Sequence, residues 1–105
     1  MINTVSLDLS SSWVTDDSLA YLRTIPHLQE VNLSDTEIGD AGIAHLSQCH
    51  RLAIVHLART KVTDEGVKLL SAQNLLSFLD VTGTAVSESA INALRAQNPY
   101  LRVER

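Results

Sequence analysis

The sequence has few of the residues that mark disulfide-stabilised or cofactor-binding proteins. In 105 residues it contains one cysteine, two prolines, one tryptophan, two tyrosines and one phenylalanine. A lone Cys49 cannot form an internal disulfide, so we expect a reducing, cytoplasmic location. Because aromatic residues are scarce, the core must be built mainly from leucine, valine and isoleucine, and hydrophobic residues make up 45% of the chain.

Long apolar runs and runs of like charge are absent as well. No apolar stretch approaches the ~20 residues that cross a bilayer, and the opening "MINTVSLDLSSS" lacks the pattern of a signal peptide. The net charge is −4, and the basic residues do not cluster as nucleic acid or an anionic membrane would require. The sequence therefore predicts one cytoplasmic domain with neither a nucleic-acid nor a membrane partner.

What the sequence does contain is an internal repeat. The segment "SDTEIGDAGIAHL" (34–46) returns 24 residues later as "ARTKVTDEGVKLL" (58–70). It occurs again as "TGTAVSESAINAL" (82–94), and in weaker form as "SSSWVTDDSLAYL" (10–22). With Leu28 as position one, the repeats span 4–27, 28–51, 52–75 and 76–99, followed by a partial repeat at 100–105. A fixed period of this length is typical of solenoid proteins.

Each repeat changes from strand to helical periodicity. Apolar residues alternate at positions four and six, as in "LQEVNLS" and "LSFLDVT", which predicts a strand. From position sixteen they recur every three residues, as from Ile43 to Leu46, which predicts a helix. Position twelve holds helix-capping residues and position thirteen is always acidic, as expected for the first turn of a helix. Position fifteen is always small, which we interpret as a close approach of helix and sheet.

A single strand and helix cannot bury their own apolar faces, so neighbouring repeats must stack into a continuous core. The strands would then form a parallel, concave sheet with the helices on the convex side. We therefore predict an α/β solenoid of about four strand–turn–helix units and a terminal strand.

These residues resemble a known family. The stretches "LQEVNLSDTEIGDAGIAHL", "LAIVHLARTKVTDEGVKLL" and "LSFLDVTGTAVSESAINAL" look like leucine-rich repeats of the bacterial 24-residue type, and they are similar to repeats of F-box-type adaptors. The resemblance covers residues 4–105. It implies a non-enzymatic module that binds a protein or peptide on its concave face. Position nine departs from the family's asparagine or cysteine, since it carries Ser12, Thr36, Thr60 and Thr84.

The exposed positions of the strands and the following turn supply the candidate binding residues. Position three places Ile54 beside Phe78, an apolar spot that we interpret as a small hot spot for a partner. Two touching apolar residues that simply cover each other are an equally good interpretation. Positions seven and eight are also expected on this face. The candidate partner-binding residues are Ile54, Phe78, His56, Asp80, Asn32, Glu30, Arg59 and Arg102.

Histidine beside aspartate raises a chemical alternative. His56 next to Asp80 has the residue types of a general base with its orienting carboxylate, or of two metal ligands. An open sheet face offers no pocket, and the sequence has no activated nucleophile and no glycine-rich phosphate loop. We therefore expect no catalytic residue, no metal and no cofactor. His27 and His50 fall near the helix-to-strand returns and are interpreted as surface residues, and Cys49 as a partly buried filler.

The two ends of the solenoid leave a second function open. Trp13 and Tyr100 are the odd members of their columns, and each is a possible cap over the exposed core or a subunit contact. Uncapped ends are open sheet edges, which pair readily with another chain. The alternative function is thus a self-assembling structural unit that forms a homodimer through its ends. A piece of a longer repeat protein would show the same ends.

Overall fold

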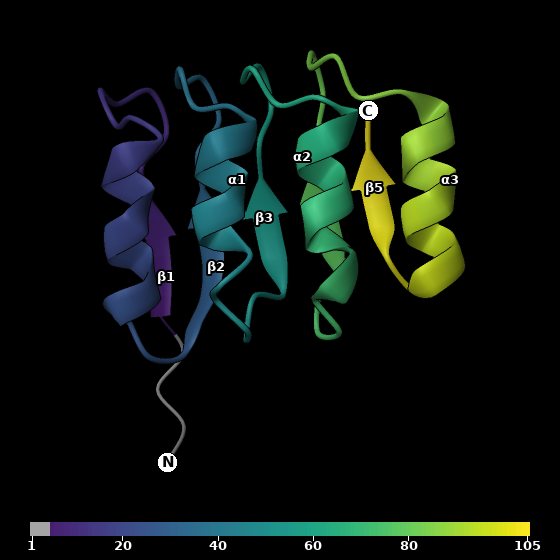
Figure 1. Ribbon diagram of the computed structural model, residues 1–105, viewed down its shortest axis with the longest axis horizontal. Helices are drawn as coiled ribbons and strands as arrows, with labels where there is room; N and C mark the ends of the chain where they lie inside the picture. The colour runs from purple at the N-terminus through teal and green to yellow at the C-terminus, as the bar shows by residue number, and fades with distance from the viewer. Residues whose placement is uncertain (1–4) are drawn as a thin grey trace.

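The computed structural model describes residues 5–105, and Thr4, which begins the first repeat, lies outside them. Strands and helices alternate along the whole described chain (Figure 1). The elements η1 and η2 are 3₁₀ helices. In chain order the elements are β1 (Val5–Asp8), η1 (Asp17–Thr24), β2 (Leu28–Asn32), α1 (Asp40–Leu46), β3 (Ile54–His56), α2 (Asp64–Lys68), η2 (Leu69–Ala72), β4 (Phe78–Asp80), α3 (Glu88–Gln97) and β5 (Arg102–Glu104).

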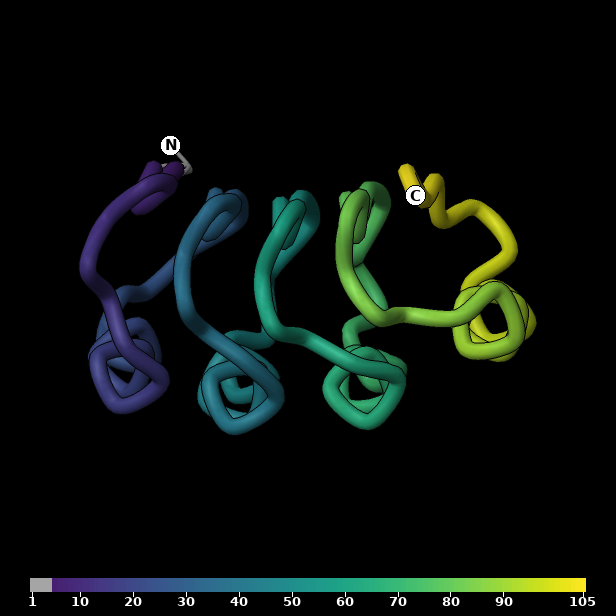
Figure 2. The backbone as a smooth tube through the Cα atoms, turned by 90° about the horizontal axis from the view of Figure 1, so that it is seen from above, coloured from purple at the N-terminus to yellow at the C-terminus, as the bar shows by residue number. Residues whose placement is uncertain are grey.

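The strands form one parallel sheet in the order β1-β2-β3-β4-β5. In register, Glu30 pairs with Ile54, Ile54 with Phe78, and Phe78 with Arg102, each partner being one repeat further along the chain. Figure 2 shows the helices in an outer, more widely spaced row and the strands in an inner row. The inner face of the sheet is therefore concave, and the α/β solenoid predicted from the repeat is confirmed. Within residues 5–105, no helix is long and apolar enough to cross a membrane.

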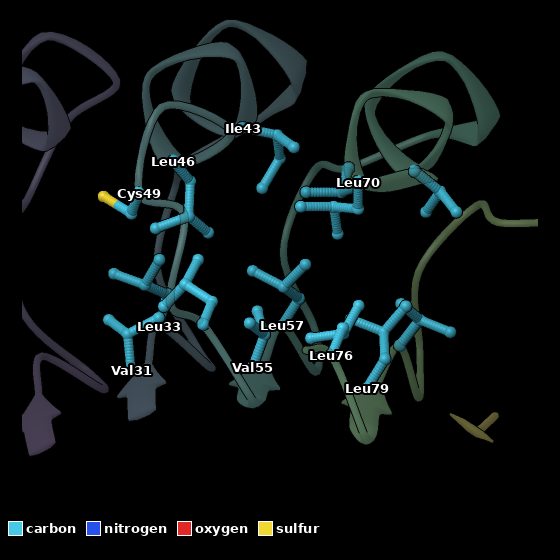
Figure 3. Packing of buried hydrophobic residues seen from close by; sticks show 14 of the residues in the cluster. Val31, Leu33, Ile43, Leu46, Cys49, Val55, Leu57, Leu70, Leu76 and Leu79 are labelled. Atoms are coloured by element: carbon cyan, nitrogen blue, oxygen red, sulfur yellow. The ribbon is translucent and has the colours of Figure 1, made fainter. Parts of the chain in front are cut away.

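The core runs without interruption between the sheet and the helices. Position four is fully buried in the middle repeats, where Val31, Val55 and Leu79 have no exposed surface. Figure 3 shows these valines and leucines packed against Ile43, Leu46 and Leu70 from the helices. The first repeat differs, because Leu7 and Leu9 have a neighbour on one side only and are half-buried. Burial of each repeat thus depends on the repeats beside it.

The helices are shorter and less regular than the sequence pattern indicates. The first repeat forms an eight-residue 3₁₀ helix, η1, and the third forms a five-residue α-helix that continues as the 3₁₀ helix η2. Bonds from Ser18 N to Thr15 O and from Leu19 N to Asp16 O span three residues and tighten the start of η1. Only α3 reaches ten residues among the described elements. Packing on the core, rather than helix length, holds these short segments in place.

A ladder of carboxylates links each repeat to the next. Asp16 Oδ1 accepts a hydrogen bond from Gly39 N at 2.8 Å, and Asp40 Oδ1 accepts one from Thr63 N at 2.8 Å. Asp64 Oδ1 accepts one from Ser87 N at 2.6 Å. In each case the acid at position thirteen binds position twelve of the following repeat. The predicted first-turn acids therefore also tie the start of the next helix to their own repeat.

The small residue at position fifteen has a different neighbour from the one expected. A Cβ placed on Gly42 would lie 2.7 Å from Asp16 Oδ1 and 2.9 Å from Leu19 Cδ1. A Cβ on Gly66 would collide with the Asp40 carboxylate. The interpretation of a close helix–sheet approach is thus wrong for these glycines. They make room for the carboxylate ladder and for the preceding helix.

The hydroxyl at position nine acts within its own repeat. Thr36 Oγ1 donates to Leu33 O at 2.7 Å, and Thr60 Oγ1 donates to Leu57 O at 2.8 Å. Ser12 and Thr84 donate to Leu9 O and Val81 O in the same way. A hydroxyl therefore satisfies the carbonyl at position six and closes the turn after each strand.

Candidate functional site

The concave face presents a short row of side chains that crosses four strands. Glu30 on β2, Ile54 on β3, Phe78 on β4 and Arg102 on β5 occupy paired register positions. The first three are half-buried and Arg102 is exposed. The row therefore runs from a carboxylate through two apolar side chains to a guanidinium.

His56 joins this row from position five of β3. Its Nε2 lies 3.5 Å from Glu30 Oε2, and its ring centroid lies 5.4 Å from that of Phe78 with a tilt of 53°. About 27% of the His56 side chain remains exposed, against 39% for Glu30. A tilted contact at this distance is a favourable arrangement of two rings. We refer to Glu30, Ile54, His56, Phe78 and Arg102 as the concave cluster.

The position-five side chains Asp8, Asn32 and Asp80 each bond the turn that follows their own strand. Asn32 Oδ1 accepts a bond from Ser34 N at 3.0 Å, and Asp80 Oδ1 accepts bonds from Thr82 N and Oγ1 at 2.9 and 2.7 Å. Asp8 binds Ser10 in the same way, and these two bonds lower the pKa of the Asp8 carboxyl. Such contacts stabilise the chain reversal after each strand. Asn32 and Asp80, both candidate partner contacts, therefore also have a structural role.

Among the four complete repeats, His56 is the one position-five side chain that does not form this turn contact. In its repeat, the following N–H belongs to Ala58, and it donates instead to Ser34 Oγ of the preceding repeat at 3.2 Å. The imidazole is thus left to contact Glu30 and Phe78 on the open face.

The structure rejects the arrangement in which Asp80 orients His56. The two residues are paired in register, but the Asp80 carboxylate accepts from Thr82, and Glu30 is the acid close to the imidazole. Among residues 5–105, no three side chains of histidine, cysteine, aspartate or glutamate are grouped as metal ligands. The carboxylate beside the His56 imidazole is therefore that of Glu30, not that of Asp80.

Arg59 lies at the turn beyond β3 and is tied to the preceding repeat. Its Nε and Nη2 donate to the two Asp35 oxygens at 2.6 and 2.9 Å. This pairing lowers the pKa of Asp35 and raises that of Arg59. Both residues, like Ser11 and Gly83 at the same position, have φ between 55 and 71°. Position eight therefore has a left-handed backbone conformation in every repeat, and the Arg59 guanidinium is already paired with Asp35.

Position seven is buried in the two middle repeats, contrary to the expectation from alternation, and half-buried at Ser10 and Thr82. Ser34 and Ala58 are 8% and 3% exposed, because the chain turns inward directly after the strand. The left-handed residue that follows redirects the backbone, so strict alternation ends at position six. In the two middle repeats the concave face is accordingly formed by positions three and five of the strands.

The aromatic residues at the ends do not cover the core. Trp13 is 98% exposed and Tyr100 is 90% exposed, so neither acts as a cap in this chain. At the C-terminal end the buried residue is Leu101, which is 3% exposed, and its N–H donates to Asn98 O at 3.1 Å. Asn98 in turn donates to Leu76 O at 2.6 Å. This local turn moves the core contact from Tyr100 to its neighbour, and a subunit contact at either aromatic residue stays a prediction.

Sequence reasoning missed the contacts between repeats. The signal was present, since an acid at position thirteen always accompanies a serine, threonine or glycine at position twelve. It was interpreted within one repeat, where both residue types suit a helix start. Only stacking at the observed distance brings Asp40 of one repeat to Thr63 of the next.

The fold and the site define a class of protein: a solenoid of stacked strand–helix repeats with a partly apolar concave face. Residues 24–47 and 48–71 each match a family model described as "Leucine Rich repeat". Residues 24–71 thus contain two consecutive leucine-rich repeats, as the repeat pattern predicted. Domains of this family are typically non-enzymatic and bind other proteins.

Among solved structures, the chain is similar to the LRR protein LIC12759 of Leptospira interrogans. The two share 15% sequence identity with a TM-score of 0.56. The match covers 82% of this chain and 27% of that protein, so the chain spans about a quarter of its length. No protein of curated function matches the sequence. At this identity the similarity supports the fold alone.

Proposed function

We propose that the concave cluster binds an extended segment of a partner protein, with an apolar residue seated on Ile54, His56 and Phe78. The observation that supports this function most directly is the Ile54–Phe78 pair, which is half-buried on an otherwise polar sheet face. Small clusters of apolar and aromatic residues surrounded by polar ones are typical of interface hot spots.

The charges at the two ends of the cluster define the chemistry of the segment. Glu30 lies on the side of β2, and Arg102 lies on the side of β5 with no acidic partner among residues 5–105. Strands are separated by about 4.8 Å, so three spacings between Glu30 and Arg102 amount to roughly 14 Å. Four or five residues of extended peptide cover that length. The segment should therefore carry a basic residue towards Glu30, an apolar residue in the centre and an acidic residue towards Arg102.

A displayed library of random seven-residue peptides tests this function. We expect the selected peptides to share the basic–apolar–acidic order and to lose binding to an Ile54→Ser/Phe78→Ser variant. Arg102→Glu should select peptides with a basic residue in place of the acidic one. Leu75→Ser is the matched control, because Leu75 is 56% exposed and lies in a helix-to-strand return away from this face. Peptides that bind the double variant as well as the original protein would overturn the proposal.

Self-association through the first repeat is a second candidate function. The half-buried Leu7, Leu9 and Val14 lie at the N-terminal end, whereas the same positions in the middle repeats are fully buried. Tyr21, 76% exposed, and Trp13 belong to the same repeat. A second copy would supply the same apolar end and a β1 edge strand able to pair with this one.

Light scattering after size exclusion separates the two functions. A dimer that dissociates on Trp13→Ser/Tyr21→Ser substitution, but not on Tyr100→Ser substitution, supports self-association through this end. A monomer whose mass is independent of concentration contradicts it. Neither result depends on the peptide selection, because no residue is shared between the two surfaces.

A further inference from the structure

A cavity lies between the first two repeats, at the segments where η1 returns to β2 and α1 returns to β3. These returns lie at the lower edge of Figure 1. The cavity has a volume of about 210 Å³, and its lining includes Arg23, His27, Cys49, His50 and Arg51. None of the lining residues belongs to the concave cluster. The proposal that follows therefore goes beyond the peptide-binding function.

Cys49, which lines the cavity, is shorter than the residue at the equivalent position of the next repeat. The equivalent residue one repeat later is Gln73, which is 4% exposed. Gln73 Nε2 donates to Ser47 O of the preceding repeat at 2.8 Å and so closes the space between the two returns. A cysteine is too short for that contact. In Figure 3 the Cys49 sulfur points away from Leu46, towards the side of the first repeat.

The lining is basic in a protein with an excess of acid. The chain has 12 acidic and 8 lysine or arginine residues, yet no acid is among the lining residues of this cavity. Within residues 5–105, neither Arg23 nor Arg51 forms an ion pair, whereas Arg59, Lys61, Lys68 and Arg105 each lie within 4.0 Å of an acid. Arg23 Nε donates to Ala20 O at 3.3 Å, so its two Nη groups and the whole Arg51 guanidinium remain available for an external anion.

The ends of η1 and α1 do not account for this charge. Basic side chains are favourable at helix C-termini because the last carbonyls carry partial negative charge. The next border, between the ends of α1 and η2, also joins two helix ends but carries Gln73, Asn74 and Leu75 at the positions equivalent to Cys49, His50 and Arg51. Leu22 O and Leu46 O already accept from Ile25 N and Cys49 N at 3.1 and 2.9 Å. Arg23 does bond a last-turn carbonyl of η1, Ala20 O at 3.3 Å, but Arg51 has no such contact with a helix end among the described residues.

We propose that this cavity binds a phosphate-type oxyanion, held by Arg23 and Arg51 with His27 and His50 beside them. Planar guanidinium groups match the oxygen geometry of phosphate and can bind it through two hydrogen bonds each. Burial raises the pKa of the Cys49 thiol, an effect that Arg23 opposes, so the sulfur is uncharged at neutral pH and does not repel the anion. The anion is either a free phosphate or the phosphoryl group of a modified side chain on a partner.

Titration of the isotope-labelled protein with inorganic phosphate, followed by amide NMR shifts, tests this site. We expect saturable shifts around Cys49 and Arg51, and none from chloride at the same ionic strength. Arg23→Gln/Arg51→Gln should weaken phosphate binding at least tenfold. Arg95→Gln should leave it unchanged, because Arg95 occupies the position of Arg23 in the fourth repeat but lies outside the cavity.

A filling substitution provides an independent check. Cys49→Gln gives the second repeat the side chain that Gln73 provides in the third repeat. This side chain should fill the cavity and weaken phosphate binding at least tenfold while leaving the fold intact. Should this variant fail to fold, the arginine double variant decides alone. Equal shifts with chloride, or unaltered phosphate binding by the double variant, would overturn the proposal. A parallel titration with a phosphoserine peptide identifies the source: tighter binding than phosphate assigns a modified partner, and equal or weaker binding assigns the free anion.

Discussion

Asp64 connects the third repeat to the fourth by accepting hydrogen bonds from Ser87, the N-cap residue of α3. Its Oδ1 accepts from Ser87 N at 2.6 Å and its Oδ2 accepts from Ser87 Oγ at 2.7 Å, across 23 residues of sequence. Ser87 Oγ in turn accepts from Ala90 N at 3.2 Å and caps α3. A carboxylate in one repeat thus fixes the cap of the next helix. Asp40 and Thr63 repeat the arrangement one unit earlier.

Removal of the Asp64 carboxylate should loosen the border between the third and fourth repeats. Asp64→Ala leaves Ser87 N without its acceptor, so we expect a lower melting temperature and faster amide exchange in α3. Glu88→Ala is the matched control, because Glu88 is also a first-turn acid but lies 4.0 Å from Arg105 rather than on a following cap. Equal losses in the two variants would show that the acid acts only through the helix dipole.

The same carboxylate makes stability depend on pH. The backbone and side-chain hydrogen bonds from Ser87 lower the pKa of Asp64 below its ordinary value of 3.8. A lowered folded-state pKa means that the contribution is fully present above 3.8 and is lost as pH falls through the lower value. We expect chemical unfolding below pH 3.8 to be less pH-dependent in Asp64→Asn than in the original protein. A pH dependence identical in both proteins would contradict the assignment.

Gly66 and Gly39 should respond differently to alanine. In a helix interior alanine is favoured over glycine by about 1 kcal/mol, but a Cβ at Gly66 would displace the Asp40 carboxylate and approach Val62 Cγ1 to 3.2 Å. Gly66→Ala should therefore lower the melting temperature despite its better propensity. A Cβ at Gly39 meets Lys61 O at an ordinary 3.6 Å, so Gly39→Ala should have little effect. A stabilised Gly66→Ala variant would show that the Asp40 carboxylate can move aside without loss of stability.

Leu57 tests the continuity of the core. It is fully buried in the third repeat, with repeats on both sides. Leu57→Ala should lower the free energy of unfolding by about 2–5 kcal/mol, the range for truncation of a buried leucine. In a short solenoid this loss should appear as one cooperative shift of the whole denaturation curve. Lys61→Ala, at an exposed position of the same repeat, is the control, and similar losses in both would refute the assigned register.

Much of the fold was predictable because the repeat supplies an internal comparison. Val31, Val55 and Leu79 share one column, and a residue type that recurs in a column must meet the same neighbours each time. The 24-residue period predicted that the repeats stack. The change from alternating apolar residues to a three-residue spacing predicted a strand followed by a helix in each repeat. The concave row at position three followed from the same register.

The ends and turns were less predictable for physical reasons. At the C-terminal end, the column places Tyr100 in the core, but the turn held by Asn98 buries Leu101 instead. After each strand, the left-handed residue at position eight ends the alternation, and no column of residue types identifies it, since Ser11, Asp35, Arg59 and Gly83 are unlike one another. Backbone conformation there is set by the stacked neighbours.

The sequence by itself determined the solenoid, its period and the faces of its strands, because apolar periodicity depends only on residue order. The tertiary structure decided which polar groups meet. In it, Asp40 and Asp64 link neighbouring repeats in addition to being first-turn acids. It also places the His56 imidazole next to Glu30 rather than Asp80, and it forms a cavity with a basic lining beside Cys49. Those contacts join residues 22 to 26 positions apart, or cross from strand to strand, and they depend on distances that only the stacked chain fixes.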